Sequence, residues 1–370
     1  MGFKIYSSTH SPSNMGLNSI SRALESLPTD RICGLVFCGT SDAVGYHDLL
    51  NDIKSTVYNA LGRKVPVTLI PQYLLPEGGL SMDVYTLEGE AKIDIAEQNG
   101  VCYGLLCSEV ESLLFIEGVP SSDFSMGVKE QSEEVFSKID ALLSLHGFAV
   151  DDIVRQWNYI GNIVSYRDGK QNYQEFNDAR SAYYSAGSWS NGYPAATGIG
   201  VSCEGVIVGG IAFRKAEGRA IYPIDNPLQV AAHVYSKNVL IDDDVNAIKS
   251  TPKFERAKLI ETAGGVCCFV SGTAAIRGEQ SAAKLDAKEQ TVMTIENIEY
   301  LVSPENLQRH FCKPYNLKYA QLQVFIKSAQ DYAEVRGVVE KAYPQMSVVY
   351  TIADVCRSEL LVEIEGILMS

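Results

Sequence analysis

The sequence lacks any concentration of positive charge. Its 31 lysines and arginines are outnumbered by 45 aspartates and glutamates, which gives a net charge of −14, and no basic cluster is visible. Nucleic acids and anionic membrane surfaces attract proteins through clustered positive charge. We therefore expect neither as a partner. A small anionic ligand remains compatible with this composition, because it needs only one or two well-placed arginines.

Long apolar runs are also missing. No stretch approaches the roughly 18 apolar residues of a membrane span, and the first ten residues have no apolar segment typical of a signal peptide. The nine cysteines are odd in number, lie mostly in apolar runs and form no C-x-x-C pair. This pattern predicts reduced, buried thiols and a cytoplasmic location.

Ligand sets for metals and cofactors are not apparent either. The five histidines are scattered without the spacing of metal ligands, so no zinc site is expected. Gly198-Ile-Gly200 resembles part of a dinucleotide-binding loop, but the third glycine is absent and no helix is predicted after it. We therefore expect no cofactor.

The composition is that of a globular protein, with 46% apolar and 21% charged residues. A length of 370 residues predicts two or three domains. Residues 1–99 are interpreted as an N-terminal α/β segment, in which strands at Ile32–Cys38 and Val65–Ile70 flank a helix at Tyr46–Leu61.

From residue 100 onward the predicted elements follow the order βαβαββ twice, which indicates an internal repeat. The first copy, residues 100–215, comprises Leu113–Glu117, a helix from about 129 to 145, Ile153–Ile160, Tyr173–Ser185, and a hairpin of Ile199–Val201 with Val206–Phe213. The second, residues 263–370, comprises Val266–Val270, Glu289–Val302, Ala320–Lys327, Ala333–Ala342, and a closing hairpin of Ser347–Ala353 with Glu359–Leu368. Residues 216–262 form a loop-rich linker that contains the acidic run 242–244.

The strand that ends the second copy carries two carboxylates. Along Leu360–Gly366 the alternation places Glu363 and Glu365 on one face, roughly 7 Å apart. Taken alone, this pattern favours a solvated face, because charged residues are seldom buried. The alternative is that one glutamate lies in a pocket as an acid or base. Aligning the closing strands of the two copies places Gly209 opposite Glu363, and a carboxylate kept in only one copy favours a single active site.

The repeated unit resembles the RidA (YjgF) superfamily of reactive-intermediate deaminases. In the second copy the resemblance rests on Phe269-Val-Ser-Gly-Thr, Gln290 with Glu296-Asn-Ile, and Val362-Glu-Ile-Glu. In the first it rests on Glu130-Gln131, the segment Gly147 to Asp151-Asp-Ile-Val, and Phe176-Asn177. The resemblance implies an α/β fold of tandem RidA-like, chorismate-mutase-like βαβαββ units behind the N-terminal segment. RidA proteins form trimers with sites between subunits, so whether this chain is a monomer or a homo-oligomer stays open.

Over roughly residues 100–370 the chain further resembles the chorismatases, which remove the enolpyruvyl group of chorismate. The matching stretches are Trp157-Asn-Tyr-Ile, Tyr173-x-x-Phe176-Asn-x-Ala-Arg180, Pro194-Ala-Ala-Thr-Gly-Ile-Gly, Asn226-Pro-x-Gln229-Val and Cys356-Arg357-x-x-Leu-Leu-Val-Glu363. The resemblance implies that Glu363, the first glutamate of the closing strand, is catalytic. It also assigns Cys356, seven residues earlier, to the subtype that forms 3-hydroxybenzoate; the hydrolysing subtype has an alanine there. The role of Arg357 stays open.

A chorismate-like substrate is a dianion, which calls for arginines or paired hydroxyl and amide donors. Arg180, on the helix Tyr173–Ser185, is the first candidate, with a surface arginine as the alternative. Gln229 and Tyr235 are weaker candidates, because they could simply order the linker. The backbone N–H groups of Ser271, Gly272, Thr273 and Ala274 could also bind the ligand, or these residues could form a plain tight turn.

Three functions are thus compatible with the sequence. One is a chorismatase that releases pyruvate, with Glu363 as acid and a dihydroxycyclohexadiene carboxylate or a hydroxybenzoate as the other product. Another is a RidA-type imine or enamine hydrolase, although no arginine stands near Ala196 or at Gln345–Val348, where RidA deaminases carry theirs. The last is a non-catalytic protein that binds a small metabolite on the same fold. The retention of Glu363 in one copy argues against the last.

Overall fold

The computed structural model describes residues 2–8, 17–25, 27–40, 45–88, 91–236, 250–310 and 313–370. The acidic run 242–244 and Cys312 lie outside these residues. Within the described ranges, no helix combines the length and apolar character needed to cross a membrane. The same ranges contain no group of three or more His, Cys, Asp or Glu residues placed to hold a metal ion.

The N-terminal segment forms a four-stranded sheet, in the order β1-β4-β2-β3, covered by two helices. Its helix α2 has the bounds predicted from the sequence, because Leu50, Ile53 and Val57 recur on one face and become buried. Gly62, with φ of 66°, ends that helix in the left-handed conformation. The elements are β1 (Gly2–Ser8), α1 (Leu17–Glu25), β2 (Ile32–Gly39), α2 (Tyr46–Leu61), β3 (Val67–Ile70) and β4 (Leu80–Glu88).

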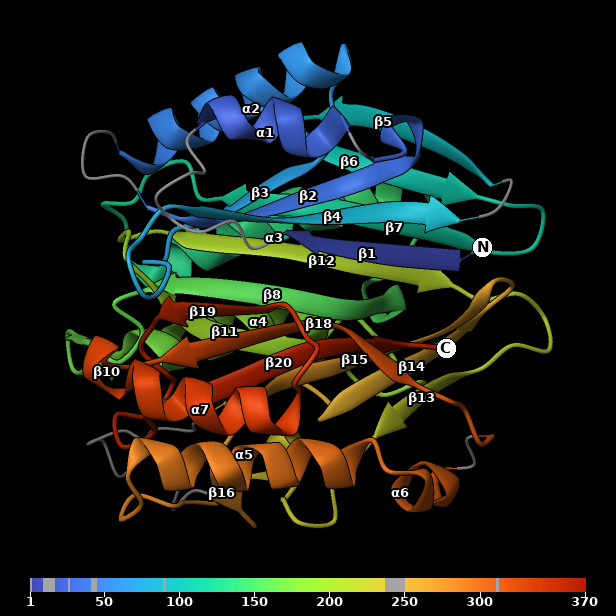
Figure 1. Cartoon of the computed structure of the whole chain (residues 1–370). Coiled ribbons are helices and arrows are strands. Elements are labelled where there is room, and N and C mark those ends of the chain that lie inside the picture. Colours follow the sequence, from blue (N-terminus) through green and yellow to red (C-terminus); the bar gives the residue numbers. More distant parts are fainter. Residues whose placement is uncertain are drawn as a thin grey trace.

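The next part of the chain, here called the first unit, has a six-stranded sheet in the order β11-β8-β12-β7-β6-β5. Its elements are β5 (Lys92–Gln98), β6 (Val101–Cys107), β7 (Ser112–Pro120), α3 (Val128–Leu145), β8 (Ile153–Gly161), β9 (Tyr166–Arg167), β10 (Lys170–Gln171), α4 (Asn172–Tyr184), β11 (Ala195–Val201) and β12 (Val206–Arg214). The helices α3 and α4 cover one face of this sheet (Figure 1).

The second unit has a six-stranded sheet of equivalent design, in the order β13-β14-β15-β20-β18-β19. Its elements are β13 (Ile221–Ile224), β14 (Ala257–Thr262), β15 (Gly265–Ala274), β16 (Ile276–Arg277), β17 (Gln280–Ser281), α5 (Ala287–Leu301), α6 (Pro304–Arg309), β18 (Lys318–Ile326), α7 (Tyr332–Ala342), β19 (Val348–Ile352) and β20 (Val362–Met369). The predicted α/β class, with two βαβαββ units each backed by two helices, is confirmed.

The N-terminal segment is a third copy of the repeat, which the sequence did not reveal. Its strands follow the order β1-β4-β2-β3, which matches β7-β12-β8-β11 in the first unit and β15-β20-β18-β19 in the second. The prediction of two copies was therefore incomplete. The N-terminal copy keeps the alternation of strands and helices but not the side-chain motifs, so its topology could be recognised only in space.

Both predicted hairpins are wrong. Strand β11 pairs in parallel with β8, and β12 pairs with the opposite edge of β8 and with β7. The second unit repeats this arrangement, with β18 between β19 and β20. The short connections between these strands suggested hairpins. In the structure, β8 lies between β11 and β12, and β18 lies between β19 and β20.

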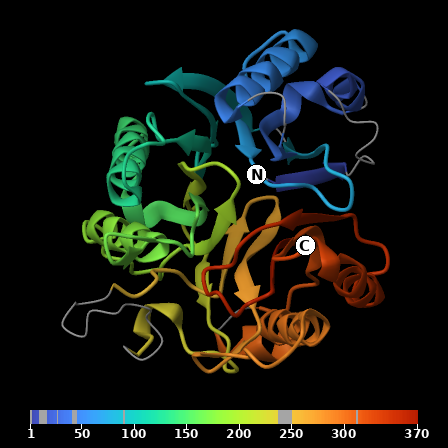
Figure 2. The ribbon, with the colours of Figure 1, turned by 90° about the vertical axis from the view of Figure 1, so that its left-hand side faces the viewer.

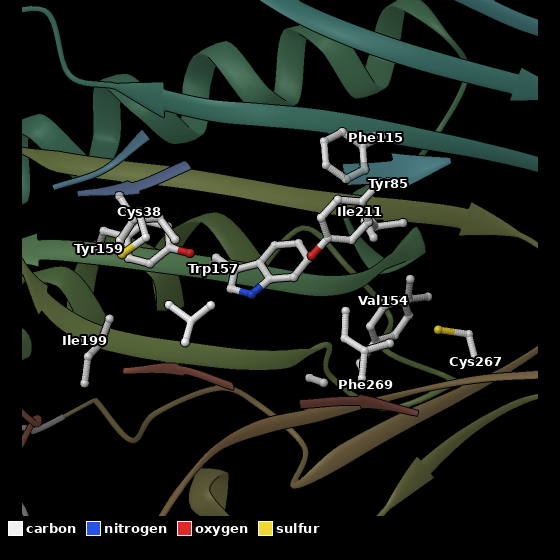
Figure 3. Packing of buried hydrophobic residues seen from close by; sticks show 14 of the residues in the cluster. Cys38, Tyr85, Phe115, Val154, Trp157, Tyr159, Ile199, Ile211, Cys267 and Phe269 are labelled. Atoms are coloured by element: carbon white, nitrogen blue, oxygen red, sulfur yellow. The ribbon is translucent and has the colours of Figure 1, made fainter. Parts of the chain in front are cut away.

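The three units surround a common centre, with their sheets facing inward and their helices outside (Figure 2). The central core contains buried aromatic residues from all three units, among them Tyr85, Phe115, Trp157 and Phe269 (Figure 3). A separate apolar cluster fills the space beneath the helices of each unit. The inward face of each sheet is therefore an interface between units, and that is where the candidate site lies.

Candidate active site

Strand β20 is buried on both faces. Glu363 and Glu365 are each only 4% exposed, so the solvated face that the strand pattern alone favoured is wrong. The face that carries the carboxylates points toward the first unit rather than toward water, because the sheets of the two units pack face to face. Two buried carboxylates are costly unless each is neutral or paired. Their surroundings show that one is paired and the other is not.

Glu363 lines a pocket between the first and second units. Helix α4 contributes Tyr173 and Asn177, the segment before β14 contributes Phe254 and Arg256, and the loop before β20 contributes Cys356. The full lining consists of Gln171, Tyr173, Gln174, Asn177, Tyr235, Pro252, Phe254, Arg256, Gly272, Ala274, Ile276, Cys356, Arg357, Leu360 and Glu363. One wall is thus supplied by each unit and a third by the segments that connect them.

The strand register corrects the alignment of the closing strands. Phe115-Ile-Glu-Gly118 and Phe269-Val-Ser-Gly272 occupy equivalent places, because the N–H of Gly118 donates to Thr68 Oγ1 at 2.7 Å, as that of Gly272 donates to Thr197 Oγ1 at 3.0 Å. Two residues beyond these glycines, Pro120 pairs with Ile207, whereas Ala274 pairs with Glu363.

Glu363 therefore corresponds to Ile207, and Gly209 corresponds to Glu365 rather than to Glu363. In the N-terminal unit the same register places Ser81 at the position of Glu363 and Asp83 at that of Glu365. Only the second unit has a carboxylate at the position that faces the pocket.

The Glu363 carboxyl lies in a dry environment. Burial and, to a smaller extent, the neighbouring Glu365 charge raise the pKa of Glu363, Arg155 and Arg256 lower it, and the resulting pKa is about 8. The carboxyl therefore keeps its proton near neutral pH. An acid with a pKa close to the working pH is the form suited to general acid catalysis.

Gly272 permits the close approach of Glu363 to the β15 backbone. A Cβ atom at this position would collide with Glu363 Oε1 and would approach Thr197 Cγ2 at 3.1 Å. No strained backbone conformation is involved at Gly272, so the requirement for glycine arises from space alone.

Replacing Gly272 with alanine is expected to lower the rate of the reaction at this site by about 10²-fold. The added methyl group displaces the Glu363 carboxyl, and a misplacement of about 1 Å can cost 10²-fold in rate. Steady-state kinetics with purified protein measures the effect. Gly337→Ala in α7 is the matched control, because no atom lies within 4 Å of the added methyl group there. Equal rates in the two variants would show that Gly272 does not position the acid.

Glu365 is paired with an arginine of the first unit. Arg155 Nη2 donates to Glu365 Oε2 at 2.6 Å and to Thr197 Oγ1 at 2.9 Å. Trp157 Nε1 donates to Glu365 Oε1 at 3.2 Å, and the Thr197 hydroxyl donates to Glu365 Oε2. These groups connect β20 of the second unit to β8 and β11 of the first.

Arg256, which was not selected from the sequence, and Arg357, whose role was left open, bring positive charge to the pocket. Arg256 is 3% exposed and its Nη2 donates to Val230 O at 2.7 Å and to the Tyr235 hydroxyl. Its Nε has no hydrogen-bond partner among the described residues. Arg357 Nη1 donates to Glu279 O at 2.9 Å, and both guanidinium groups lie within 6 Å of the Tyr235 ring.

Four of the predicted binding residues are not among the residues that line the pocket. Arg180 is buried beneath α4, where its Nη2 donates to Asn177 Oδ1 and its guanidinium lies over the Phe176 ring. Gln229 donates to Ile276 O at 3.3 Å. Ser271 Oγ donates to Glu255 O, and Thr273 Oγ1 donates to Ser271 O. Direct ligand contact by these four residues stays a prediction, whereas Tyr235, Gly272 and Ala274 do line the pocket.

Cys356 lines the pocket together with Glu363. Burial, with a smaller contribution from the nearby Glu363, raises the pKa of its thiol to about 12. The thiol is therefore protonated at neutral pH and is not a nucleophile of the thiolate type. Its contribution to the pocket is its small size and its weakly polar S–H group.

Several wall residues were not selected from the sequence. Tyr173 and Asn177 stand in the stretch that carried the family resemblance, so that motif was the available signal. Arg256, Phe254 and Pro252 had no such signal, because nothing in Pro252–Arg256 shows that this segment crosses the pocket before β14 begins. Its location follows from a tertiary contact, the hydrogen bond from Ser271 N to Arg256 O at 3.0 Å.

Comparison with known proteins gives consistent results. The family model described as "Chorismatase FkbO/Hyg5-like, N-terminal" matches residues 90–212. A 3-hydroxybenzoate synthase of Streptomyces hygroscopicus is 34% identical over 234 residues, 61% of this chain and 66% of that protein. A chorismatase of Streptomyces rapamycinicus is 30% identical over 240 residues, 63% of this chain and 68% of that protein. The chain thus spans about two thirds of the length of these relatives.

A solved structure supports the fold over the whole chain. A chorismatase crystal structure superposes with a TM-score of 0.70, covering 99% of this chain and 98% of that one, at 22% sequence identity. At this identity the similarity shows a shared fold. It includes the sheet of strands β1 to β4, which precedes the residues matched by the family model.

Proposed function

The chain belongs to the chorismatase family, and from this premise we propose that it removes the enolpyruvyl group of chorismate as pyruvate, with Glu363 as the general acid. The observation that carries the proposal is the buried Glu363 carboxyl, whose pKa is raised to about 8 in a pocket lined by two arginines. A protonated acid beside two arginine side chains suits a dianionic substrate whose enol ether bond breaks after protonation.

The chemistry requires a proton on carbon. Chorismate has an enol ether, and transfer of the Glu363 proton to its vinyl methylene carbon gives an oxocarbenium-like centre. Addition of water to that centre gives a hemiketal, which collapses to pyruvate and a dihydroxycyclohexadiene carboxylate. Loss of pyruvate without net addition of water gives a hydroxybenzoate instead. In both cases the first step needs an acid that is still protonated near neutral pH.

The pocket matches the charge of this substrate. With Glu363 neutral, Arg256 and Arg357 give the wall two positive charges, against the two carboxylates of chorismate. The Nε–H of Arg256 is buried and has no partner within the described part of the chain, so it is available to a substrate carboxylate. Asn177, which accepts from Arg180, adds a polar group to the α4 wall.

Cys356 favours 3-hydroxybenzoate as the aromatic product. A cysteine at this position marks the 3-hydroxybenzoate-forming subtype in the resemblance described above, and one matched relative is a 3-hydroxybenzoate synthase. A neutral thiol in the wall next to Glu363 occupies space that an alanine would leave to water. The cysteine therefore disfavours capture of the intermediate by water.

Replacing Cys356 with alanine is expected to change the product ratio more than the rate. The dihydroxycyclohexadiene carboxylate should increase at the expense of 3-hydroxybenzoate, while total pyruvate release stays within about tenfold, because the acid Glu363 is untouched. Chromatography of the products alongside a pyruvate assay checks this. Cys107→Ala, at an exposed cysteine, is the control. An unchanged ratio would remove Cys356 from the account of the product.

Incubation of the purified protein with chorismate tests the proposed function. The expected result is release of pyruvate in amounts equal to the sum of the ring products. Absence of pyruvate from protein that is folded and binds chorismate would contradict the proposal.

A further inference from the structure

The ion pair between Glu365 and Arg155 is buried and shared between two units. Arg155 is 1% exposed and Glu365 is 4% exposed, so neither charge is screened by solvent. Arg155 comes from β8 of the first unit, and Glu365 stands two residues after Glu363 on the same face of β20. In the first unit the position of Glu365 is occupied by Gly209, and in the N-terminal unit by Asp83.

A second path connects Glu365 to the acid. Thr197 Oγ1 accepts from Arg155 Nη2 and from the N–H of Gly272, and its own proton goes to Glu365 Oε2. The hydroxyl thereby uses its one donor and both its acceptor positions. Gly272 in turn provides the surface against which the Glu363 carboxyl lies.

We propose that Glu365, held by Arg155 and Thr197, is a positioning residue that keeps Glu363 protonated and fixed against Gly272. This inference rests on the proposed function, in which Glu363 is the acid. It gives Glu365, the second carboxylate of the strand, a part in the same reaction, although Glu365 does not contact the substrate. It also makes the acid dependent on the packing of the first unit against the second.

The charge of Glu365 acts directly on Glu363. A negative charge beside a carboxyl disfavours its ionisation, and this influence is stronger for a buried group than for an exposed one. The other groups near Glu363 are Arg155 on β8, Arg256 before β14, Arg357 and Cys356 in the loop before β20, Tyr173 on α4 and Tyr235. Burial raises the pKa of the Cys356 thiol and of the Tyr173 hydroxyl, so both are neutral.

Replacing Glu365 with glutamine is the test. The wild-type alkaline limb of kcat/KM for pyruvate release is expected near pH 8, where Glu363 loses its proton. Glutamine keeps the size of the side chain and its acceptor oxygen but removes the negative charge, so Glu363 ionises more readily. The limb should move to lower pH by about one unit.

The variant Arg155→Gln/Glu365→Gln is the matched control, because it removes both charges together. Arg155 lowers the pKa of Glu363, so the limb of the double variant should lie between those of Glu365→Gln and the wild type. If Glu365→Gln does not fold, the double variant is compared with the wild type alone, and a limb at lower pH still supports the proposal.

An alkaline limb that stays in place while the rate falls equally at every pH would overturn the proposal, since that is the effect of a purely structural role. This outcome differs from failure of the proposed function. If Glu363→Gln is inactive but Glu365→Gln does not move the limb, the acid assignment stands and the positioning role is lost. If Glu363→Gln retains activity, the acid assignment itself is lost.

Discussion

Replacement of Glu363 by glutamine is expected to abolish pyruvate release from chorismate while leaving the fold and the affinity for chorismate nearly intact. The amide keeps the shape of the side chain but cannot deliver a proton to carbon. General acid catalysis is typically worth 10²–10⁴-fold, so roughly 3–5 kcal/mol of the barrier is involved. Ligand affinity should persist, because the pocket cations Arg256 and Arg357 are unchanged.

Glu359→Gln is the control for this substitution. Glu359 stands in the same loop that leads into β20, but its side chain does not line the pocket. Its replacement should leave the rate within about twofold, as expected for a group that takes no part in proton transfer. Circular dichroism of both variants would show whether the fold is retained. A rate for Glu363→Gln equal to that of Glu359→Gln would refute the acid assignment.

Replacement of Arg155 by methionine is expected to lower the free energy of unfolding by about 3–5 kcal/mol. Methionine fills much of the space but leaves the Glu365 carboxylate buried without its cation, and an uncompensated charge in the interior is costly. Trp157 Nε1 and the Thr197 hydroxyl still donate to Glu365, but neither carries charge. Denaturation by guanidinium chloride, followed by far-ultraviolet circular dichroism, measures the change.

Two further variants serve as controls for the stability of Arg155→Met. Arg309→Met removes an exposed pair with Glu305 at 2.8 Å and should cost less than about 1 kcal/mol. The double variant Arg155→Met/Glu365→Leu should recover most of the loss, because an apolar pair of similar volume replaces a buried ion pair at little cost. A loss for Arg155→Met no larger than that for Arg309→Met would show that the buried ion pair contributes no more to stability than an exposed pair.

The sequence predicted local structure well where side-chain patterns are strong. Helix α2 was placed at its observed bounds from the helical spacing of its apolar residues. The βαβαββ order of the first and second units was likewise visible. Strand pairing was not visible in the sequence. The lengths of the connections do not reveal that β8 lies between β11 and β12, or that β18 lies between β19 and β20.

The carboxyl that we propose as the acid was selected from the sequence, whereas most of the residues around it were not. Glu363 was selected through the resemblance and the unequal repeat. The structure shows that its face of the strand is buried, and it changes the counterpart of Glu363 in the first unit from Gly209 to Ile207. Arg256, Thr197 and Arg155 surround the acid through contacts between units, which leave no periodic signal in the sequence. The N-terminal copy was missed for a related reason: its topology is shared, while its side chains at the equivalent positions, Ser81 and Asp83, differ.

The most direct test of the central claim is the rate of pyruvate release from chorismate, measured side by side for the wild type and Glu363→Gln across the pH range. The account predicts release by the wild type that declines as the pH rises through about 8, where Glu363 loses its proton, and none above background by the variant. Equal release by both proteins, or none by a folded wild type, would contradict it.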